Sequence, residues 1–439
     1  MNNELVINHI NILTMADNQV HKNKLVLIKD GRISAIDDGT DDAKHPNVVD
    51  GRGKYLMPGL INMHTHLGDN PHDLMLYLVN GVTAIRNMWG YEGFRLRQWA
   101  FGTRVFHHLR LRQQIESGEI AGPAIFTAGP LLDGKDPFFP KFMCLHALAS
   151  KEQTHQVIKD QASKGYDFIK IYSNLSRQNF DDIMEIAALY GMPVTGHVPD
   201  AVGIKHALKS GLRSIEHLYG FFNPYNPGSN IRKEEVKELA GIAARNHVWN
   251  CPTLIANERI PNTEKQNEFE DEDEMQYIPN RNKKAMRFLI RESRKLFDKK
   301  GVGGNHEYME FLYMIVRRLH SEGAGLLLGT DKAVPYVVAG FSEHREMRLL
   351  SKAGLSNYEV IKTATINAAQ CLHRENEMGT IEIGKRANMI ITDTNPLDDL
   401  KTIFHHAGVI KDGVYYTRER CDAILNGVRR NKVNITPQQ

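Results

Sequence analysis

Two histidines separated by one residue, His64 and His66, close an apolar stretch that begins at Leu60. Alternate side chains of a β-strand point to the same face, so a strand here would present both imidazoles on one side. Two neutral imidazoles in this arrangement can bind a divalent metal ion, with each ring nitrogen about 2.0–2.1 Å from a zinc ion. The chain contains 20 histidines, so the pair alone could equally be structural, and the rest of the sequence must decide.

Further residues that can bind a metal or move a proton stand at the ends of other apolar segments: Lys170, His197, His217 and Asp331. Each has an ordinary structural alternative. A single histidine at a strand end is usually hydrogen-bonded, an aspartate often caps a helix, and a lysine can extend outward to pair with an acid. Coincidence does not readily explain ligand-type residues at the ends of five strands. We therefore predict a metal centre where these strands end.

The elements that must position these residues are short apolar strands that alternate with amphipathic segments such as 180–190 and 233–246. This alternation favours an α/β fold with a parallel sheet. Including the stretch that ends at His66, eight segments are predicted as strands; the others are 81–86, 123–129, 167–172, 192–197, 213–217, 247–254 and 324–331. The pattern predicts a (β/α)8 TIM-like barrel over residues 58–377, with the active site where the strands end.

Both ends of the chain differ in character from the middle. The segments before residue 57 contain a hairpin signature at Asp30-Gly31, and a second one at Asp412-Gly413 follows the strand-like segments 379–385 and 389–393. Asp-Gly favours the tight turns of antiparallel hairpins. We predict that residues 1–57 and 378–439 together build a small β-sandwich beside the barrel, and that residues 357–371 form a helix that precedes it.

Residues 256–304 are an insertion, because a loop between a strand and a helix usually needs only about 2–6 residues. The first part of the insertion is acidic, from Glu268 to Glu274, and the second part, 281–300, is basic and predicted to be helical. Two interpretations remain open. The insertion is either a solvated helix pair held by opposite charges or a lid over the mouth of the barrel.

The composition excludes several classes of protein. In 439 residues, 55 Lys and Arg balance 52 Asp and Glu, and the formal net charge of +3 indicates no nucleic-acid partner. No apolar run is long enough to span a membrane and no signal peptide is recognised, so we expect no membrane partner and a cytoplasmic location, or secretion only if a signal peptide has been removed. Cys144, Cys251, Cys371 and Cys421 show no paired spacing and are predicted to be reduced thiols.

Several motifs together carry a resemblance to a known family. They are Pro58-Gly59-Leu60-Ile61-x-x-His64-x-His66, Ile169-Lys170-Ile171-Tyr172, Gly196-His197-Val198-Pro199, Ser214-Ile215-Glu216-His217, Gly329-Thr330-Asp331, Phe341–Glu346 and Gly384–Asn388. The chain resembles the amidohydrolase superfamily, in particular the imidazolonepropionase-related branch that includes metal-dependent Xaa-Pro dipeptidases. Asn62 and Asn388 stand where this branch usually or often has aspartate, and neither position is a metal ligand in the family pattern.

The resemblance implies a site with two divalent ions, expected to be zinc. It assigns His64, His66 and Asp331 to the more buried ion, His197 and His217 to the more exposed one, and Lys170 to a bridging position. A protonated lysine would repel both ions, so the resemblance implies that CO2 converts Lys170 into an anionic carbamate. A hydroxide between the ions would then attack a carbonyl, with Asp331 as the general base.

The expected activity is hydrolysis of an amide C–N bond in a small molecule, either an Xaa-Pro-like dipeptide or an N-acyl amino acid. A cyclic-amide, lactone or phosphotriester hydrolase would use the same metal site, and an inactive scaffold paralogue is an alternative of a different class. Tyr172 and Tyr219 follow ligand strands and are candidate substrate contacts, although packed tyrosines would occupy the same positions. Homo-oligomer formation also remains open.

Overall fold

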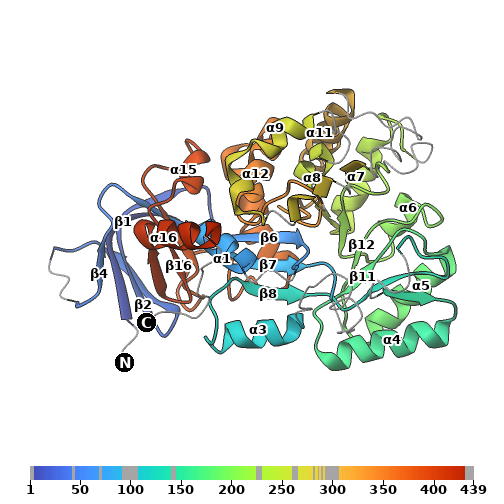
Figure 1. The fold of residues 1–439 in the computed structure, drawn as a ribbon, viewed down its shortest axis with the longest axis horizontal. Coiled ribbons are helices and arrows are strands. Elements are labelled where there is room, and N and C mark those ends of the chain that lie inside the picture. The colour runs from blue at the N-terminus through green and yellow to red at the C-terminus, as the bar shows by residue number, and fades with distance from the viewer. Residues whose placement is uncertain are drawn as a thin grey trace.

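The computed structural model describes residues 4–41, 45–68, 72–90, 107–139, 145–223, 230–259, 265–279, 282–284, 286–287, 290–291 and 306–430. Cys144 and most of the basic segment 281–300 lie outside the described residues. Figure 1 shows strands from both chain ends at one end of the molecule, and alternating strands and helices over the rest. No helix within the described ranges is long and apolar enough to cross a membrane.

Strands from both chain ends form one eight-stranded sheet in the order β17-β16-β15-β5-β1-β2-β3, with β4 paired to β1. The bounds are β1 Glu4–Leu13, β2 Val20–Lys29, β3 Arg32–Asp38, β4 Val48–Asp50, β5 Tyr55–Pro58, β15 Met389–Thr392, β16 Gly408–Lys411 and β17 Val414–Thr417. Both predicted hairpins are confirmed. At each turn Asp and Gly have positive φ, 51° and 74° for Asp30-Gly31 and 48° and 80° for Asp412-Gly413, as a type I′ turn requires.

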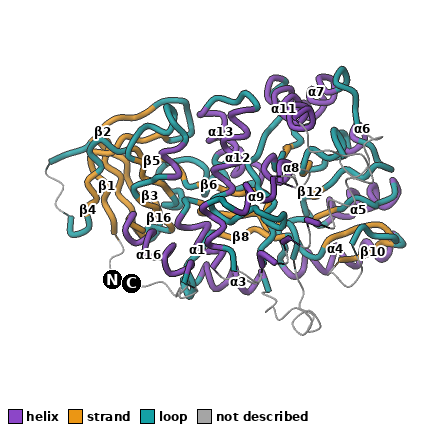
Figure 2. Tube along the Cα trace, turned by 45° about the horizontal axis from the view of Figure 1, so that its top comes forward, coloured by secondary structure: helices purple, strands orange, loops and turns teal. Residues whose placement is uncertain are grey.

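The predicted β-sandwich is not confirmed, because these strands continue one another in a single hydrogen-bonded sheet. Strand β5 makes the link: Leu56 pairs with Ile12 on one side and with Ile391 on the other. Segment 379–385, which we predicted as a strand, contains none, because the positive φ angles of Gly379 and Gly384, 93° and 91°, interrupt the extended backbone. Figure 2 shows the strands of this sheet grouped together near both termini.

The middle of the chain holds two parallel sheets. One has the order β6-β7-β8 and the other β10-β9-β11-β12-β13-β14. The bounds are β6 Leu60–Thr65, β7 Val82–Asn87, β8 Ala124–Thr127, β9 Leu131–Gly134, β10 Leu145–Leu148, β11 Ile169–Ile171, β12 Val194–Gly196, β13 Ser214–Glu216 and β14 Trp249–Cys251. Each segment predicted as a barrel strand contains one, except 324–331. Strands β9 and β10 were not predicted. Every residue of β6 and β7 is buried, as expected for parallel strands covered by helices on both faces.

Backbone contacts connect the two parallel sheets at both edges of the three-stranded one. Ala128, just after β8, bridges in parallel to Phe168, just before β11, and Asn250 of β14 bridges in parallel to Leu326. The segment that contains Leu326 then returns to β6, where Met63 N donates to Leu328 O at 2.8 Å. Segment 324–331 thus lies beside both β14 and β6. It contains only an isolated β-bridge and no complete strand.

Helices follow most of the parallel strands. Their bounds are α1 His72–Val79, α3 His108–Glu116, α4 Lys151–Lys164, α5 Arg177–Leu189, α6 Ile204–Ala207, α7 Val236–Arg245, α11 His306–Ser321, α12 Ser342–Lys352, α13 Asn357–Thr363, α14 Ile366–Cys371, α15 Lys401–Phe404 and α16 Arg418–Arg429. The single helix predicted over 357–371 is wrong, because it is divided between α13 and α14. At the break, Ala364 O accepts a hydrogen bond from Ile61 N and Thr363 O accepts one from Leu328 N, so these carbonyls serve the strand segments instead of a continuous helix.

The described part of the insertion forms α8 Leu254–Arg259, α9 Gln266–Glu270 and the short 3-10 helix η3 Asp273–Tyr277. Several of its acidic residues are ion-paired. Glu272 lies 2.8 Å from Arg259 Nη2 and 3.1 Å from Arg345 Nη1, and Glu270 lies 2.6 Å from Arg287 Nη2. Opposite charges do attract here, but Arg345 belongs to α12, so the acidic segment is fixed to the body of the fold as well as to the basic part of the insertion.

Candidate metal centre

The predicted ligand residues come together at the ends of the parallel strands. His66 Nε2 lies 3.2 Å from Asp331 Oδ1, His64 Nε2 lies 3.8 Å from the same oxygen, and His217 Nδ1 lies 3.9 Å from Asp331 Oδ2. The ring centroids of His64 and His217 are 4.4 Å apart, and those of His197 and His217 are 5.0 Å apart. Four imidazoles and one carboxylate therefore share a single small region, although they come from four separate parts of the chain.

The backbone turns sharply at two of these residues. His217 and Asp331 have φ angles of 59° and 53°, a left-handed conformation that costs about 1–3 kcal/mol for residues other than glycine. Hydrogen bonds hold both turns. His217 N donates to Cys251 O at 2.9 Å, and Asp331 N donates to His64 O at 2.8 Å. The surrounding strands thus impose a backbone that aims both side chains at the same region.

Glu216 determines which nitrogen of His64 is available. His64 Nδ1 lies 2.6 Å from Glu216 Oε2. A carboxylate only accepts hydrogen bonds, so Nδ1 carries the hydrogen and Nε2 keeps its lone pair. The other oxygen of Glu216 accepts hydrogen bonds from Arg86, Thr195 and Ser214 at 2.8, 2.8 and 2.6 Å. Burial opposes ionisation of Glu216, but the charge of Arg86 and the contact with His64 hold its pKa well below the ordinary value.

Hydroxyl groups orient the other two buried histidines. His197 Nδ1 lies 2.8 Å from Ser173 Oγ, and His217 Nδ1 lies 2.7 Å from Thr253 Oγ1. Burial lowers the pKa of His64 to about 4 and holds the pKa values of His197 and His217 well below the ordinary value. All three imidazoles are therefore neutral at neutral pH, which is the form that binds metal ions.

Three buried polar atoms at this place make no hydrogen bond among the described residues: His64 Nε2, Lys170 Nζ and Asp331 Oδ1, whose 3.2 Å contact with His66 Nε2 does not have hydrogen-bond geometry. Buried polar atoms are nearly always paired, so three unpaired atoms in one place indicate a missing binding partner. Single donor atoms of His64, His66 and Asp331 all lie within 4.8 Å of one another, as ligands of one metal ion must. The lone pair of His64, the carboxylate of Asp331 and the amine of Lys170 share one buried region, and together they fit a divalent metal centre.

A second possible ligand group consists of His64, Glu216 and Cys251. The contacts make it the weaker candidate, because both oxygens of Glu216 already accept hydrogen bonds, one of them from the buried cation Arg86. Burial also raises the pKa of the Cys251 thiol well above its ordinary value, which disfavours the thiolate that would bind a metal.

Lys170 is 1% exposed, and its Nζ atom is unpaired. Burial lowers the pKa of its ammonium group to about 8, against the opposing charges of Glu216 and Asp331. A pKa in this range leaves a larger share of free amine at neutral pH than an exposed lysine has. Free amine is the form that can add CO2, so the environment of Lys170 favours the modification that the sequence predicts.

Asp331 is charged at neutral pH. Burial opposes its ionisation, but the adjacent imidazole of His66, together with the nearby imidazoles of His217 and His64, holds its pKa below the ordinary value. Tyr172 and Tyr219 border the same centre, with ring centroids 4.1 and 4.4 Å from that of His197.

Sequence reasoning missed several residues that position the ligands. Asn62 Nδ2 donates to Thr330 Oγ1 at 2.8 Å and to Glu343 Oε1 at 2.5 Å, while its Oδ1 accepts from His64 N at 2.9 Å. Asn62 therefore ties His64 to the segment that carries Asp331. Glu343 lies in the motif 341–346, so the resemblance offered a signal for it, whereas nothing in the sequence around Arg86 singled it out. The other departure, Asn388, accepts from Asp412 N and lies just before β15 of the terminal sheet.

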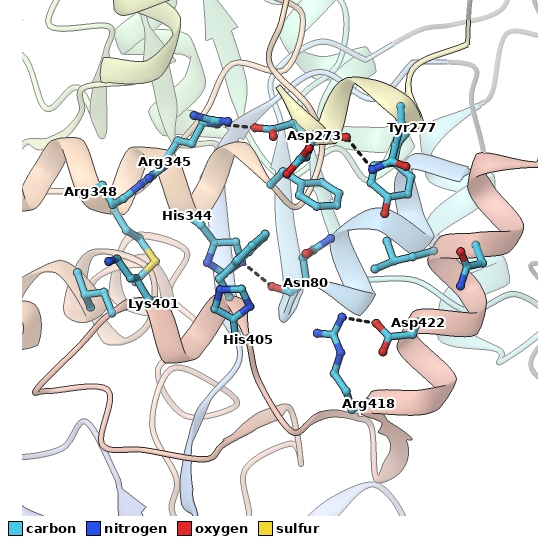
Figure 3. A pocket seen from close by; sticks show the side chains of 18 residues that line it. Asn80, Asp273, Tyr277, His344, Arg345, Arg348, Lys401, His405, Arg418 and Asp422 are labelled. Atoms are coloured by element: carbon cyan, nitrogen blue, oxygen red, sulfur yellow. Dashed lines mark hydrogen bonds and ion pairs between the residues drawn. The ribbon is translucent and has the colours of Figure 1, made fainter. Parts of the chain in front are cut away.

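A cavity of about 770 Å³ lies elsewhere, between η3, α12, α15 and α16 (Figure 3). Arg345, Arg348, Lys401 and Arg418 line it, and none of the six predicted metal ligands does. Figure 3 shows Arg418 paired with Asp422 on α16, opposite His344 and His405. This cavity is separate from the candidate metal centre.

Known proteins resemble this chain over most of its length. Residues 55–415 match the model of the amidohydrolase family. A 5-methylthioadenosine/S-adenosylhomocysteine deaminase of Caldanaerobacter subterraneus subsp. tengcongensis is 23% identical over 416 residues, which cover 89% of this chain and 85% of that protein.

Two solved structures are similar over almost the whole chain. Bottromycin amidohydrolase is 25% identical, with a TM-score of 0.78 and coverage of 98% of this chain and 91% of that one. A putative prolidase from Bifidobacterium longum is also 25% identical, with a TM-score of 0.70 and coverage of 97% and 98%. The resemblance expected from the motifs is confirmed: the chain belongs to the amidohydrolase family and is a hydrolase that acts on carbon–nitrogen bonds.

Proposed function

We propose that this enzyme hydrolyses the amide bond of an Xaa-Pro-like dipeptide or of an N-acyl amino acid. The observation that carries the proposal is the group of unpaired buried atoms, His64 Nε2, Lys170 Nζ and Asp331 Oδ1, beside three further imidazoles. The similarity to a putative prolidase over nearly the full length of both chains supports a substrate of this class.

The residues that would hold two divalent ions are those of the family pattern. His64, His66 and Asp331 would bind one ion, His197 and His217 the other, and Lys170 would bridge them as a carbamate. When bound, such ions, with zinc as the expected metal, polarise a carbonyl group and make water a stronger acid. The protein supplies neutral imidazoles and a buried lysine of lowered pKa, and Glu216 orients His64 through its Nδ1 hydrogen.

Asp331 is proposed as the general base. Its carboxylate is ionised at neutral pH and lies among His64, His66 and His217, so it can accept a proton from the attacking water and return it to the leaving amine. The backbone N–H groups of Thr330 and Asp331 donate to His64 O, and the Asn62 side chain joins Thr330 to His64. These contacts fix the position of Asp331. Tyr172 and Tyr219, next to His197, are proposed to contact the substrate.

The parallel strands are proposed to close into a (β/α)8 barrel over residues 58–377, with residues 1–57 and 378–439 as a second domain. The bridge Ala128–Phe168, the bridge Asn250–Leu326 and the hydrogen bond from Met63 to Leu328 support closure. The ligands would then lie at the carboxyl ends of the barrel strands, where active sites of this fold occur. The buried free thiols of Cys251, Cys371 and Cys421 support a reducing, cytoplasmic location.

A second candidate is hydrolytic deamination, in which ammonia leaves instead of an amino acid. The similarity to a deaminase over 89% of this chain favours it. The two functions differ in their product, because one releases an amino acid or proline and the other releases ammonia.

The test is a substrate screen with protein reconstituted in Zn²⁺, Mn²⁺ or Co²⁺. The panel contains Xaa-Pro and other dipeptides, N-acyl amino acids, adenosine derivatives, cyclic amides, lactones and phosphotriesters. We expect turnover of a dipeptide or N-acyl amino acid that is lost in the Asp331→Asn variant and kept in a control variant, Asp422→Asn, at the separate cavity. Ammonia release from adenosine derivatives alone would favour the deaminase, and full metal loading without any turnover would favour an inactive scaffold.

A further inference from the structure

Aromatic side chains border the candidate metal centre in an unbroken series. Trp89 lies 6.2 Å from His66, between ring centroids, and 5.2 Å from Phe139. Phe139 lies 5.1 Å from Phe138 and 5.2 Å from Tyr172, and the series then passes through His197 to Tyr219. We call the residues Trp89, Phe138, Phe139, Tyr172 and Tyr219 the aromatic wall.

The aromatic wall comes from loops at the same ends of the strands as the ligands. Trp89 follows β7, Phe138 and Phe139 follow β9, and Tyr172 follows β11. Buried Asp133 ties two of these loops together, because it accepts hydrogen bonds from Phe138 N at 2.8 Å and from Asn174 N at 2.7 Å. The position of the wall relative to the ligands is therefore set by the protein before any substrate binds.

Part of the wall keeps apolar surface open. Phe138 is 39% exposed, Phe139 and Tyr172 are half-buried, Trp89 and Tyr219 are buried, and none of the five residues carries a charge. Binding sites commonly combine such apolar and aromatic surfaces with a few polar groups that fix the orientation of the ligand. Aromatic rings pair favourably with one another in stacked or edge-on arrangements, so the group that gains most here is itself aromatic or large and apolar.

We propose that the aromatic wall binds an aromatic or large apolar side chain of the substrate, so that the enzyme prefers amides of residues such as phenylalanine to amides of alanine. This inference rests on the proposed function and adds the substrate class to it. Burial of a phenylalanine-sized group is expected to raise kcat/KM about 10- to 100-fold over the alanine substrate.

The kinetic test compares N-acetyl-L-phenylalanine with N-acetyl-L-alanine, and Phe-Pro with Ala-Pro, using metal-reconstituted enzyme. The variant Phe138→Ala should remove most of the preference, by lowering kcat/KM more for the phenylalanine substrates than for the alanine substrates. Phe138→Leu should keep part of the preference, because it retains apolar volume. Phe404→Ala, at an aromatic side chain of the separate cavity, is the matched control and should leave the preference unchanged.

A binding measurement separates failure of this inference from failure of the proposed function. Titration calorimetry of metal-free protein should show tighter binding of L-phenylalanine than of L-alanine, and Phe138→Ala should abolish the difference. If no amide is turned over but this difference is present, the proposed function fails and the aromatic site stands. Equal kcat/KM values for both substrate classes, or equal binding of both amino acids when no amide is cleaved, would overturn the inference.

Discussion

Replacing Glu216 with glutamine tests the connection between the buried cation Arg86 and the proposed metal ligand His64. Glu216 is fully buried, and its two oxygens are used differently. Oε1 accepts from Arg86, Thr195 and Ser214, whereas Oε2 accepts only from His64 Nδ1 among the described residues. In Glu216→Gln the amide oxygen can accept the hydrogen bonds from Arg86, Thr195 and Ser214, so the amide nitrogen faces His64.

Two effects of this substitution follow from the contacts. An amide nitrogen donates, so it favours the His64 tautomer with the hydrogen on Nε2, which blocks the nitrogen that we propose as the metal ligand. Loss of such a supporting carboxylate typically weakens metal binding about 10- to 100-fold, or about 1.4–2.7 kcal/mol. The substitution also leaves Arg86 buried without its counter-charge, which costs roughly 3–5 kcal/mol of unfolding free energy.

The assays measure these effects separately. Urea denaturation of metal-free protein gives the unfolding free energy, and competition with a chromophoric chelator gives metal affinity. Thr195→Val is the matched control, because it removes a hydrogen bond to Oε1 of the same carboxylate and leaves the His64 contact in place. We expect Thr195→Val to lower stability by about 1 kcal/mol with little change in metal affinity. Unchanged metal affinity in Glu216→Gln would refute the proposed control of the His64 tautomer.

The remaining predictions concern the ligands and the pH dependence. Lys170→Ala should lose metal and activity together, with partial rescue by short carboxylic acids; full metal loading without added acid would show that Lys170 is not the bridge. Asp331→Asn should lower kcat by about 100- to 10,000-fold, as expected for a lost general base, and near wild-type kcat would place the base elsewhere. Elemental analysis after reconstitution should give two divalent ions per chain, and less than one would contradict the ligand set. Because Arg86 and His64 hold the pKa of Glu216 below its ordinary value of 4.5, the contribution of Glu216 to stability should be present above that pH and lost as the pH falls further, in urea denaturation of metal-free protein.

The sequence determined the features that depend on neighbouring residues. The spacing of His64 and His66 predicts two imidazoles on one face of a strand, and both occur on β6 or directly after it. The Asp-Gly pairs at 30–31 and 412–413 predict hairpins, because these residues adopt the positive φ angles that such turns require. Chemical type and local period were also sufficient to identify the six candidate ligands, since the resemblance depends on the same short motifs.

Tertiary structure decided the features that depend on residues far apart in the chain. Glu216 reaches Arg86 over 130 positions and His64 over 152, so no local pattern identifies the carboxylate that orients the ligand. The aromatic wall likewise gathers residues from separate loops that the sheet brings together. The break between α13 and α14 arises because Ala364 O accepts a hydrogen bond from Ile61 N of distant strand β6. Local propensity favours one helix there, but a tertiary hydrogen bond to a buried strand determines the backbone.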